Sequence, residues 1–335
     1  MNIIIPMAGM GTRMRPHTLT IPKPLIELAG KPIVHRLVEG ITQVCNDKIG
    51  EMAFVIGDFG KEVEQKLIDI AAQVGAKGKI YYQHEAMGTA HAVWCAKESL
   101  EGKTVVAFAD TLFYADFTID PDADSIIWVK KVENPEAYGV VTTSESGIIS
   151  GFEEKPKEFV SDLAIIGIYY FSVGEKLREE LNYIVDNDIR KSGEYQLTTA
   201  LENMRAKGLK FVPGAVDEWL DCGNKNITVE THQRVLARTK GAATISEKAT
   251  IVNSVINEPC FIADNVTIQN SVVGPFVSVG YGSIIEDSIV KNSVIQKDTE
   301  IRDLLLTDSM IGNHTSLSGK KLDVSIGDYN KYELR

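Results

Sequence analysis

Two glycines and a group of basic residues near the amino terminus have the types and spacing to bind phosphate. The segment 6–16 contains Gly9, Gly11 and Arg13, and Lys23 follows between two prolines. Glycine lets the backbone approach a ligand closely, and the free amide groups of such a loop can cradle phosphate oxygens. Lysine carries a compact point charge, which suits a phosphate whose charge rises during a reaction. We therefore predict a site for a phosphate-bearing ligand in this segment.

The charge of this region differs from that of the whole chain. Residues 1–36 contain five basic residues and one acidic residue, whereas the chain of 335 residues has a formal net charge of −11. A basic loop on an acidic protein predicts a local anion site and no general attraction to nucleic acid. Two familiar phosphate-binding motifs do not fit. The dinucleotide fingerprint requires a glycine where Met14 stands, and the P-loop requires Gly-Lys followed by Ser or Thr.

The elements around the basic loop predict an α/β fold. Predicted strands occupy residues 2–5, 52–56, 79–82 and 104–109, and predicted helices occupy residues 33–44 and 63–74. The alternation of strands and helices implies a doubly wound, mostly parallel sheet. In such sheets ligands bind outside the carboxyl ends of the strands. The glycine segment, Gln83 and Asp110 each follow a predicted strand, so we expect all three at that edge.

The glycine segment, followed by Pro22-Lys23-Pro24, resembles the signature of the sugar-1-phosphate nucleotidyltransferases, also called nucleotide-sugar pyrophosphorylases. Ala8 before Gly9 is similar to the glucose-1-phosphate uridylyltransferases. The resemblance implies a Rossmann-like catalytic domain that joins a nucleoside triphosphate to a sugar 1-phosphate and releases pyrophosphate. It implies catalytic roles for Arg13 and Lys23. The nucleotide contacts that it implies come from Ala8, Gly9, Gly11, Thr12, Arg13, Gln83, Gly88 and Thr89.

Gln83, with Gly88 and Thr89, resembles the element by which this family reads the base. A side-chain amide offers a donor and an acceptor together, which can pair with the edge of a uracil or thymine ring. The uridylyl and thymidylyl members of the family carry glutamine here, so the resemblance favours UTP or dTTP over GTP. The choice between UTP and dTTP stays open, as does the identity of the sugar. We interpret His91, in the following helix, as a packing residue.

Two aspartates are candidate metal ligands. Asp110 ends an apolar strand, and Asp221 lies in the segment 218–223, which resembles the Trp-x-Asp-x-Gly motif of the family. Mg²⁺ takes only one or two protein carboxylates and completes its coordination with phosphates and water. The resemblance therefore implies a Mg²⁺ site on these two side chains. Ala109 and Thr111 depart from the Gly-Asp-Asn sequence that the family commonly shows, but they keep the carboxylate.

The residues expected to bind the sugar phosphate lie between these two aspartates in the sequence. Glu154 and Lys155 lie in a Glu-Lys-Pro element that resembles that of the family. The resemblance implies that Glu154 accepts hydrogen bonds from sugar hydroxyls and that Lys155 contacts the sugar's phosphate. Gly139 and Gly167 match positions where the backbone approaches the sugar closely. We interpret the segment 193–198, which also resembles a family stretch, as architecture that supports the site.

Beyond residue 240 the spacing of apolar residues changes. Aliphatic residues recur at intervals of five to six positions: Ile245, Ile251, Ile256, Ile262, Ile268, Val273, Val279, Ile284, Ile289, Ile295, Ile301, Leu306, Ile311 and Leu317. This period is the hexapeptide-repeat signature of a parallel β-helix, which buries its aliphatic row. The resemblance implies the left-handed β-helix that many family members append. We therefore predict a catalytic domain at 1–240 and a β-helix domain at 241–335, and we consider a homo-oligomer because such domains often pack against copies of themselves.

Composition and cysteine use predict a cytoplasmic enzyme without a membrane anchor. Hydrophobic residues make up 44% and charged residues 24% of the chain, as in globular proteins. No apolar run approaches the roughly 20 residues that span a bilayer, and the first residues do not read as a signal peptide. The cysteines at positions 45, 95, 222 and 260 lack metal-ligand spacing, which suits reduced thiols.

Two other functions fit parts of the sequence. Hexapeptide β-helices also form acyltransferases, so a bifunctional uridylyltransferase and acyltransferase of amino-sugar phosphates is one alternative, with His314 as its only candidate histidine in the repeats. A non-catalytic regulator that binds a nucleotide sugar is the other alternative. Such regulators tend to lose the lysine or a metal carboxylate, whereas Lys23, Asp110 and Asp221 are all present.

Overall fold

The chain divides into two compact units. The computed structural model describes residues 1–45, 47–115, 119, 123–239 and 244–320. The first unit consists of Met1–Ile26 and Lys31–Ile227, and the second of Glu27–Gly30 and Thr228–Arg335. The predicted domain boundary after residue 240 falls on residues 240–243, which lie outside the described residues, and it stays a prediction.

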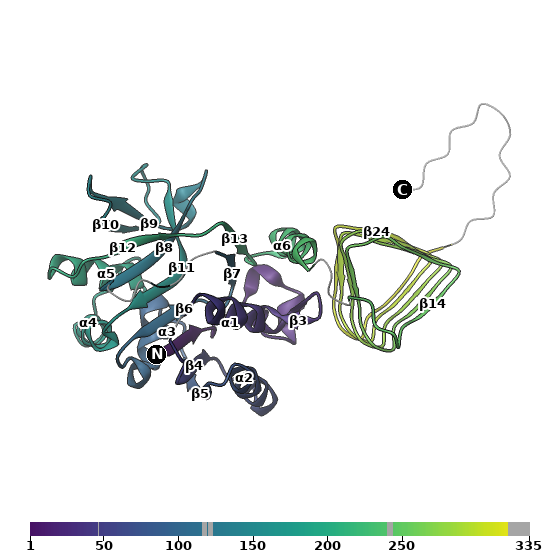
Figure 1. The fold of residues 1–335 in the computed structure, drawn as a ribbon, viewed down its shortest axis with the longest axis horizontal. Helices are drawn as coiled ribbons and strands as arrows, with labels where there is room; N and C mark the ends of the chain where they lie inside the picture. Colours follow the sequence, from purple (N-terminus) through teal and green to yellow (C-terminus); the bar gives the residue numbers. More distant parts are fainter. Residues whose placement is uncertain (46, 116–118, 120–122, 240–243, 321–335) are drawn as a thin grey trace. The chain divides into compact units, whose positions relative to one another are not determined.

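A mixed sheet forms the centre of the first unit (Figure 1). Its hydrogen-bonded order is β10-β9-β11-β6-β1-β4-β5, and β8 pairs with both β11 and β12. The strands are β1 (Asn2–Pro6), β4 (Glu51–Ile56), β5 (Lys77–Tyr82), β6 (Thr104–Ala107), β8 (Ser125–Lys131), β9 (Gly139–Thr143), β10 (Ile149–Glu154), β11 (Leu163–Phe171) and β12 (Val212–Ala215). The strands β6, β1, β4 and β5 are parallel, whereas β11 runs antiparallel to β6, β8 and β9. The predicted α/β, Rossmann-like fold is confirmed, with antiparallel strands added on one side.

Apolar side chains on the central strands hold helices to the sheet. Because side chains alternate along a strand, Ile4 and Val55 face one side, while Ile3 and Phe54 face the other, and all four are fully buried. The first pair belongs to a core that also contains side chains of α3, α4 and α5. The predicted stripe on α1, from Ile33 to Val44, is buried along its length. The helices are α1 (Ile33–Val44), α2 (Lys61–Gln73), α3 (Thr89–Cys95), α4 (Gly174–Asp186) and α5 (Leu197–Ala206).

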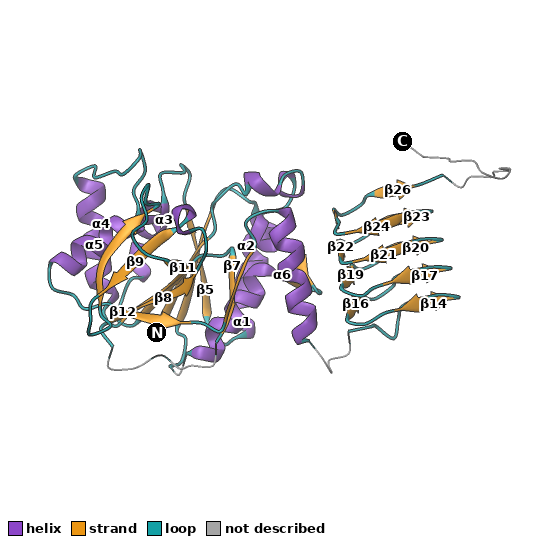
Figure 2. Ribbon diagram, turned by 90° about the horizontal axis from the view of Figure 1, so that it is seen from above, coloured by secondary structure: helices purple, strands orange, loops and turns teal. Residues whose placement is uncertain are grey.

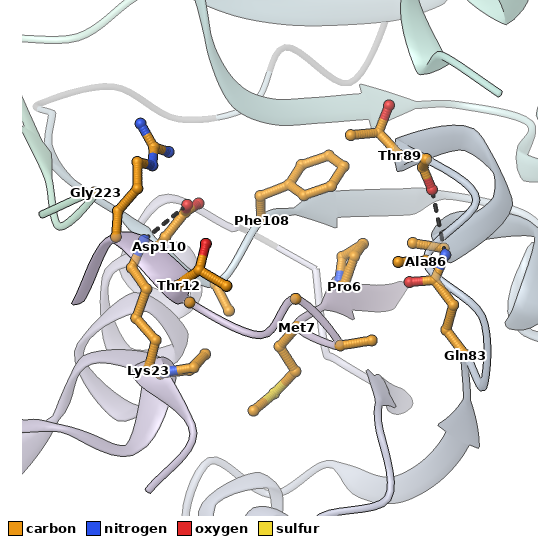
Figure 3. A pocket seen from close by; sticks show the side chains of 18 of the residues that line it. Pro6, Met7, Thr12, Lys23, Gln83, Ala86, Thr89, Phe108, Asp110 and Gly223 are labelled. Carbon is orange, nitrogen blue, oxygen red and sulfur yellow. Dashed lines mark hydrogen bonds and ion pairs between the residues drawn. The ribbon is translucent and has the colours of Figure 1, made fainter. Parts of the chain in front are cut away.

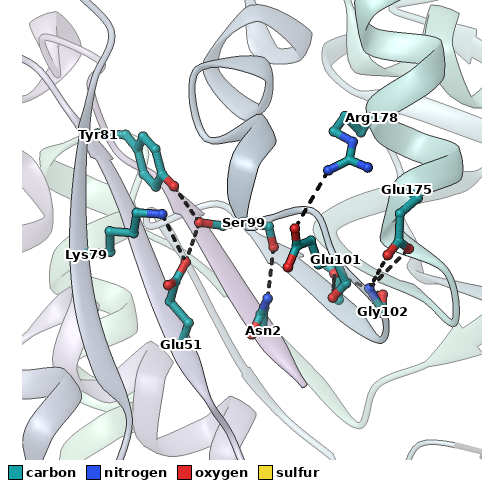
Figure 4. Close-up of polar contacts among 10 residues, drawn as sticks. Asn2, Glu51, Lys79, Tyr81, Ser99, Glu101, Gly102, Glu175 and Arg178 are labelled. Atoms are coloured by element: carbon teal, nitrogen blue, oxygen red, sulfur yellow. Dashed lines mark hydrogen bonds and ion pairs between the residues drawn. The ribbon is translucent and has the colours of Figure 1, made fainter.

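A polar cluster lies near the amino-terminal ends of β1 and β4 (Figure 4). At its centre is Ser99, which is 1% exposed and whose hydroxyl donates to the carboxylate of Glu51. The hydroxyl of Tyr81, 2.8 Å away, therefore donates to Ser99. The amide of Asn2 donates to the Ser99 carbonyl at 3.1 Å, and the Lys79 ammonium lies 3.9 Å from Glu51. Each of these five residues thus has a polar partner within the chain.

The repeats fold into a left-handed parallel β-helix, as predicted. Figure 1 shows its three faces end on, and Figure 2 shows its coils stacked one on another. The first face comprises β14 (Thr250–Val252), β17 (Thr267–Gln269), β20 (Ile284–Glu286), β23 (Glu300–Arg302) and β26 (Ser316–Ser318). The second comprises β15 (Val255–Ile256), β18 (Val272–Val273), β21 (Ile289–Lys291) and β24 (Leu305–Thr307). The third comprises β16 (Cys260–Ile262), β19 (Val277–Val279), β22 (Ser293–Ile295) and β25 (Met310–Ile311).

The predicted inward row of the β-helix is wrong at three positions. Ile285 and Val290 are fully buried, whereas the predicted Ile289 is 42% exposed and the predicted Ile284 is only partly buried. Parallel pairing aligns Ile285 with the buried Ile268 of the preceding coil. Since neighbouring side chains of a strand point to opposite faces, an offset of one residue exchanges inside for outside. Ile251, in the first coil, was also expected in this row but is 37% exposed.

Two small sheets and one further helix complete the fold. A hairpin joins β2 (Glu27–Leu28) to β3 (Lys31–Pro32), a two-stranded sheet joins β7 (Thr111–Tyr114) to β13 (Glu218–Asp221), and α6 covers Lys225–Arg238. Among the described residues, no helix combines the length and the apolar character that crossing a membrane would require.

Candidate active site

The glycine loop after β1 folds tightly against Lys23. Gly11 has a φ of 57°, in the left-handed region, and stands just before a short 3-10 helix at Thr12–Met14. A Cβ atom at this position would lie 3.0 Å from the Cβ of Lys23 and 3.0 Å from the Cγ2 of Thr18. Both the backbone conformation and the available space therefore favour glycine. The loop is thus held beside the lysine that the sequence singled out.

Lys23 forms an ion pair with Asp110 at one end of the cavity (Figure 3). Its Nζ lies 3.0 Å from Oδ2 of Asp110, and the residue itself is only 7% exposed. Asp110 lies three residues after Ala107, the last residue of β6, at the edge where it was expected. The Asp110 side chain remains 45% exposed, so one side of the pair is open to a ligand.

Asp221 lies beside Asp110 because β13 pairs with β7. In that antiparallel pair Asp221 stands opposite Thr111, and the amide of Cys222 donates to the Asp110 carbonyl at 3.1 Å. Burial raises the pKa of Asp221, and the neighbouring charge of Asp110 raises it further. The cations of Lys23 and Arg13 act in the opposite direction. Two adjacent carboxylates that disfavour each other's charge are a fitting place for a cation.

The donor set suits a hard divalent ion. Throughout the described part of the chain, no three His, Cys, Asp or Glu side chains converge on a common position that could hold a metal. Asp110 lines the cavity, and Asp221 lies beside Asp110 but is not one of the lining residues. Two neighbouring carboxylates at the edge of such a cavity suit a hard divalent ion, which can take further oxygen ligands from phosphate and water.

A cavity of about 370 Å³ opens at the carboxyl edge of the parallel strands. Its lining includes every residue predicted to contact the nucleotide: Ala8, Gly9, Gly11, Thr12, Arg13, Gln83, Gly88 and Thr89. It also includes Lys23 and Asp110. Figure 3 shows the Lys23–Asp110 pair on one side of the cavity and Gln83 on the other, with Pro6 and Met7 between them. The structure thus brings together residues that are far apart in the sequence.

Gln83 stands at the opposite end of the cavity, directly after β5. Its Nε2 donates to the Gly88 carbonyl at 3.3 Å and lies 3.0 Å from Nδ1 of His91. Gly88 has a φ of 107°, and a Cβ atom there would lie 2.5 Å from the Tyr195 carbonyl oxygen. Only glycine fits this position without displacing the backbone. The loop that carries Gly88 into α3 is therefore fixed against Gln83.

The residues predicted to hold the sugar phosphate do not line this cavity. Gly167 lies in β11, which pairs with β6, whereas Gly139 and Glu154 lie further out in β9 and β10, and Lys155 follows β10. Gly139 at the start of β9 is paired with Glu154 at the end of β10. A Cβ atom at Gly139 would come within 3.1 Å of the Glu154 carboxylate, which accepts a hydrogen bond from Thr198 Oγ1 at 3.0 Å. Lys155 follows with a φ of 43°, and its amide donates to the Tyr138 carbonyl.

Gly167 connects these strands to the cavity. It lies in β11 with a φ of 86°, and its carbonyl accepts a hydrogen bond from the amide of Phe108 at 2.9 Å. Phe108 lines the cavity. Burial raises the pKa of Tyr169, two residues further along β11, and the negative charge of Glu154 adds to this rise. Glu154 is paired with Gly139, and Val140 of the same strand is paired with Ala164 of β11. Gly139, Glu154 and Gly167 therefore lie on three neighbouring strands.

Several lining residues were not predicted from the sequence. Phe108, Glu194 and Gly223 all border the cavity. Glu194 belongs to the segment 193–198, which we interpreted only as support. That supporting role is visible, because the amide of Leu197 donates to the Thr89 hydroxyl at 3.0 Å. The segment had been noticed as a motif, but nothing in the sequence distinguished a side chain that borders the cavity from one that packs behind it.

Comparison with known proteins identifies the family to which the chain belongs. Residues 2–238 match the family model for nucleotidyl transferases. The chain belongs to the nucleotidyl transferase family, which confirms the predicted family and the predicted class of enzyme. A glucose-1-phosphate thymidylyltransferase of Streptomyces griseus is 27% identical over 343 residues, covering 95% of this chain and 94% of the relative. The bifunctional protein GlmU of Methanocaldococcus jannaschii is 30% identical over 336 residues, covering 94% of this chain and 78% of the relative.

A solved structure shares the fold of the first unit. A Bacillus anthracis protein described as a glucose-1-phosphate thymidylyltransferase, crystallised with sucrose, superposes with a TM-score of 0.59. The two chains are 23% identical, and the match covers 71% of this chain and 95% of that protein. At this level of identity the likeness speaks for the fold alone.

Proposed function

We propose that this nucleotidyl transferase joins UTP or dTTP to a sugar 1-phosphate, yielding a nucleotide sugar and pyrophosphate, with Mg²⁺ as its cofactor. The observation that carries the proposal is the cavity itself. It combines a glycine loop, the Lys23–Asp110 pair and Gln83 at one edge of the sheet. Phosphate-binding groups thus occupy one end of a single space, and a base-reading amide occupies the other.

The reaction asks the protein mainly for alignment and for neutralisation of charge. The phosphate oxygen of the sugar attacks the α-phosphorus of the nucleotide in line with the departing pyrophosphate. Backbone amides of the glycine loop and the Arg13 guanidinium hold the leaving pyrophosphate. Lys23, fixed by its burial, offsets the charge that builds near the α-phosphate. Lys23 is in place before substrate binds, because it is buried and paired with Asp110, and such preorganisation is the condition for efficient electrostatic stabilisation.

Asp110 and Asp221 are the residues that would hold Mg²⁺. When bound, the ion would supply positive charge to the phosphates of both substrates. Burial is the main cause of the raised pKa of Asp221, and the charge of Asp110 adds to it; a bound cation would favour the charged forms of both carboxylates. Lys23 already compensates part of that charge from its position 3.0 Å from Asp110.

The sugar 1-phosphate would bind beyond Phe108. Lys155 would contact its phosphate and reduce the repulsion between two anionic substrates. Glu154 would accept hydrogen bonds from sugar hydroxyls, since its carboxylate is held by Thr198 and retains further acceptor sites. Gly139 and Gly167 would bring the backbone close to the sugar ring.

The proposal is tested by a substrate matrix. Pyrophosphate release is measured with UTP, dTTP, CTP, GTP and ATP, each against several sugar 1-phosphates, with and without Mg²⁺. We expect turnover with UTP or dTTP that requires both the sugar phosphate and the divalent ion. Absence of pyrophosphate release with every pair, or a preference for a purine nucleotide, would overturn the proposal.

The structure gives the two alternatives less support. The side chain of His314 is 69% exposed, and its Nδ1 lies 3.5 Å from Asp298, which is a surface arrangement. Consumption of acetyl-CoA in the presence of an amino-sugar phosphate would favour the bifunctional alternative. A non-catalytic regulator would have no need for Lys23, Asp110 and Asp221 in one place. A homo-oligomer and a cytoplasmic location stay predictions.

A further inference from the structure

The Gly88 carbonyl identifies which atom of the Gln83 amide is the nitrogen. Its nitrogen lies 3.3 Å from the Gly88 carbonyl oxygen and 3.0 Å from Nδ1 of His91. A carbonyl oxygen can only accept a hydrogen bond, so the amide atom beside it has to be the NH₂ group. Nδ1 of His91 therefore accepts the second amide hydrogen. It follows that His91 is neutral and carries its proton on Nε2.

This arrangement leaves only the amide oxygen of Gln83 for a ligand. Both amide hydrogens are used inside the protein, by Gly88 and His91. Figure 3 shows the amide oxygen of Gln83 turned towards the side of the cavity where Pro6 lies, while the nitrogen is on the dashed bond. A lone acceptor discriminates between pyrimidines, because N3 of uracil and thymine carries a hydrogen, whereas N3 of cytosine is itself an acceptor.

We propose that His91 is a positioning residue that holds the oxygen of Gln83 towards the base and thereby sets the preference for UTP or dTTP over CTP. This inference rests on the proposed function. It revises our sequence-based interpretation of His91 as a packing residue. Packing and positioning are compatible here, because His91 is 6% exposed and forms part of α3.

The surroundings of His91 keep it in the accepting form. On its own helix, Cys95 Sγ lies 3.9 Å from Nδ1, and the ring of Trp94 is stacked at 5.6 Å between centroids. From the segment opposite, the ring of Tyr195 lies 6.2 Å away. Burial lowers the pKa of His91 below its ordinary value of 6.5; the negative charge of Glu85 opposes this shift, and the positive charge of Arg190 adds to it.

Protonation of His91 would reverse the orientation of Gln83. Nδ1 would then carry a hydrogen and face the amide hydrogens of Gln83. Turning the amide over would relieve that conflict, but it would place the oxygen against the Gly88 carbonyl and the NH₂ group towards the base. An NH₂ group pairs with N3 of cytosine and opposes N3–H of uracil. The preference for UTP should therefore weaken as the pH falls through the pKa that His91 has in the folded protein.

The test compares two variants that differ at the position of Nδ1. His91→Phe keeps a ring but removes the acceptor, whereas His91→Asn places an amide oxygen on the same Cγ to which Nδ1 is bonded. The kcat/KM for UTP and for CTP is measured with the sugar phosphate that the matrix identifies. We expect His91→Phe to reduce the UTP-to-CTP ratio by about tenfold or more, mainly through KM, because one oriented hydrogen bond contributes roughly that factor. We expect His91→Asn to retain most of the ratio.

The pH profile of the natural protein provides a second test that needs no variant. The UTP-to-CTP ratio should fall on acidification below pH 6.5 in the natural protein and stay level in His91→Asn. Protonation of the triphosphate, with a pKa of about 6 for a phosphate, affects both nucleotides alike and cancels in the ratio.

The following outcomes decide whether His91 positions the amide of Gln83. An unchanged ratio in His91→Phe, or a ratio that does not depend on pH in the natural protein, would overturn the positioning role. If His91→Phe fails to fold, the pH profile and His91→Asn still decide. If the natural protein turns over neither UTP nor dTTP, the proposed function fails, and that result is visible before any variant is made.

Discussion

Two polar clusters lie at opposite ends of the same parallel strands, and their polar groups differ in where they find partners. At the amino end, Ser99 joins Glu51, Tyr81 and Asn2 in bonds that are closed within the chain. At the carboxyl end, Lys23 is buried against an Asp110 side chain that stays 45% exposed. Polar groups whose partners are all internal stabilise a fold, whereas groups left partly open are available to a ligand.

This difference predicts that the two ends respond differently to substitution. Replacing Lys23 or Asp110, which form the open cluster, should reduce activity and leave stability intact, because active-site charges are held in place at some cost to the fold. Replacing a residue of the closed cluster around Ser99 should reduce stability and leave activity intact. The four substitutions below follow from this contrast.

The largest effect is expected for Lys23→Met, which removes the ammonium but keeps most of the side-chain volume. Loss of one preorganised charge typically costs roughly 3–4 kcal/mol of transition-state stabilisation, or about 10²- to 10³-fold in rate. Pyrophosphate release should fall by at least the smaller factor, and the thermal unfolding midpoint should be unchanged or higher. Lys61→Met, at an exposed ion pair on α2, serves as the control. A rate close to that of the natural protein would rule out Lys23 as a catalytic group.

Asp110→Asn should have the next largest effect. It removes one of the two carboxylates that we propose for Mg²⁺, and it leaves Lys23 without its partner at 3.0 Å. The rate at a fixed Mg²⁺ concentration should fall by roughly 10²-fold, and part of it should return at higher Mg²⁺. Asp69→Asn, on the surface of α2, controls for a general loss of negative charge. Unaltered dependence on Mg²⁺ would remove Asp110 from the proposed metal site.

In the closed cluster, Ser99→Ala should reduce stability without reducing activity. The carboxylate of Glu51, whose side chain is only 21% exposed, and the hydroxyl of Tyr81 would each lose a partner. An unsatisfied buried polar group costs about 1–3 kcal/mol, so the free energy of unfolding in urea should fall by that amount. The kcat/KM of the folded variant should match that of the natural protein. A loss of activity at full stability would show that the two ends are coupled.

The smallest effect is expected for Lys79→Met at the rim of the same cluster. The Lys79 ammonium lies 3.9 Å from Glu51 and its side chain is 37% exposed, so solvent screens most of the attraction. Exposed ion pairs of this kind contribute at most about 1 kcal/mol. Urea unfolding should show a change within that limit, and the change should shrink further at high salt. A loss as large as that of Ser99→Ala would mean that Lys79 is part of the closed network.

Much of the candidate site could be predicted because its residues follow strand ends. Apolar runs locate β1, β5 and β6, and the first polar or glycine residues after each run lie at the same edge of a parallel sheet. Gly9, Gln83 and Asp110 were therefore expected to be neighbours, and all three border one cavity. The lysine was identified by its prolines, and its burial beside Asp110 agrees with a fixed position.

The remaining features depend on contacts that leave no mark in a local pattern. The antiparallel direction of β11 has no compositional signal, since strands buried on both faces look alike whichever way they run. The inward side of each β-helix strand depends on pairing with the next coil, which is why Ile284 was chosen where Ile285 is buried. The contact between His91 and Gln83 depends on how the loop before α3 folds, and Gly88 alone does not reveal it.

The β-helix and the sheet also differ in how far apart in the sequence their paired strands lie. Ile268 is aligned with Ile285, and Ile285 with Ile301, so each coil meets the one made just before it. In the sheet, by contrast, Asn2 is aligned with Thr104. Structures whose contacts join residues close together in the chain fold fast, and repeats can add one after another. The β-helix can therefore lengthen as the ribosome delivers chain, and insertion or deletion of one whole coil would change its reach while leaving every other coil's register as it was.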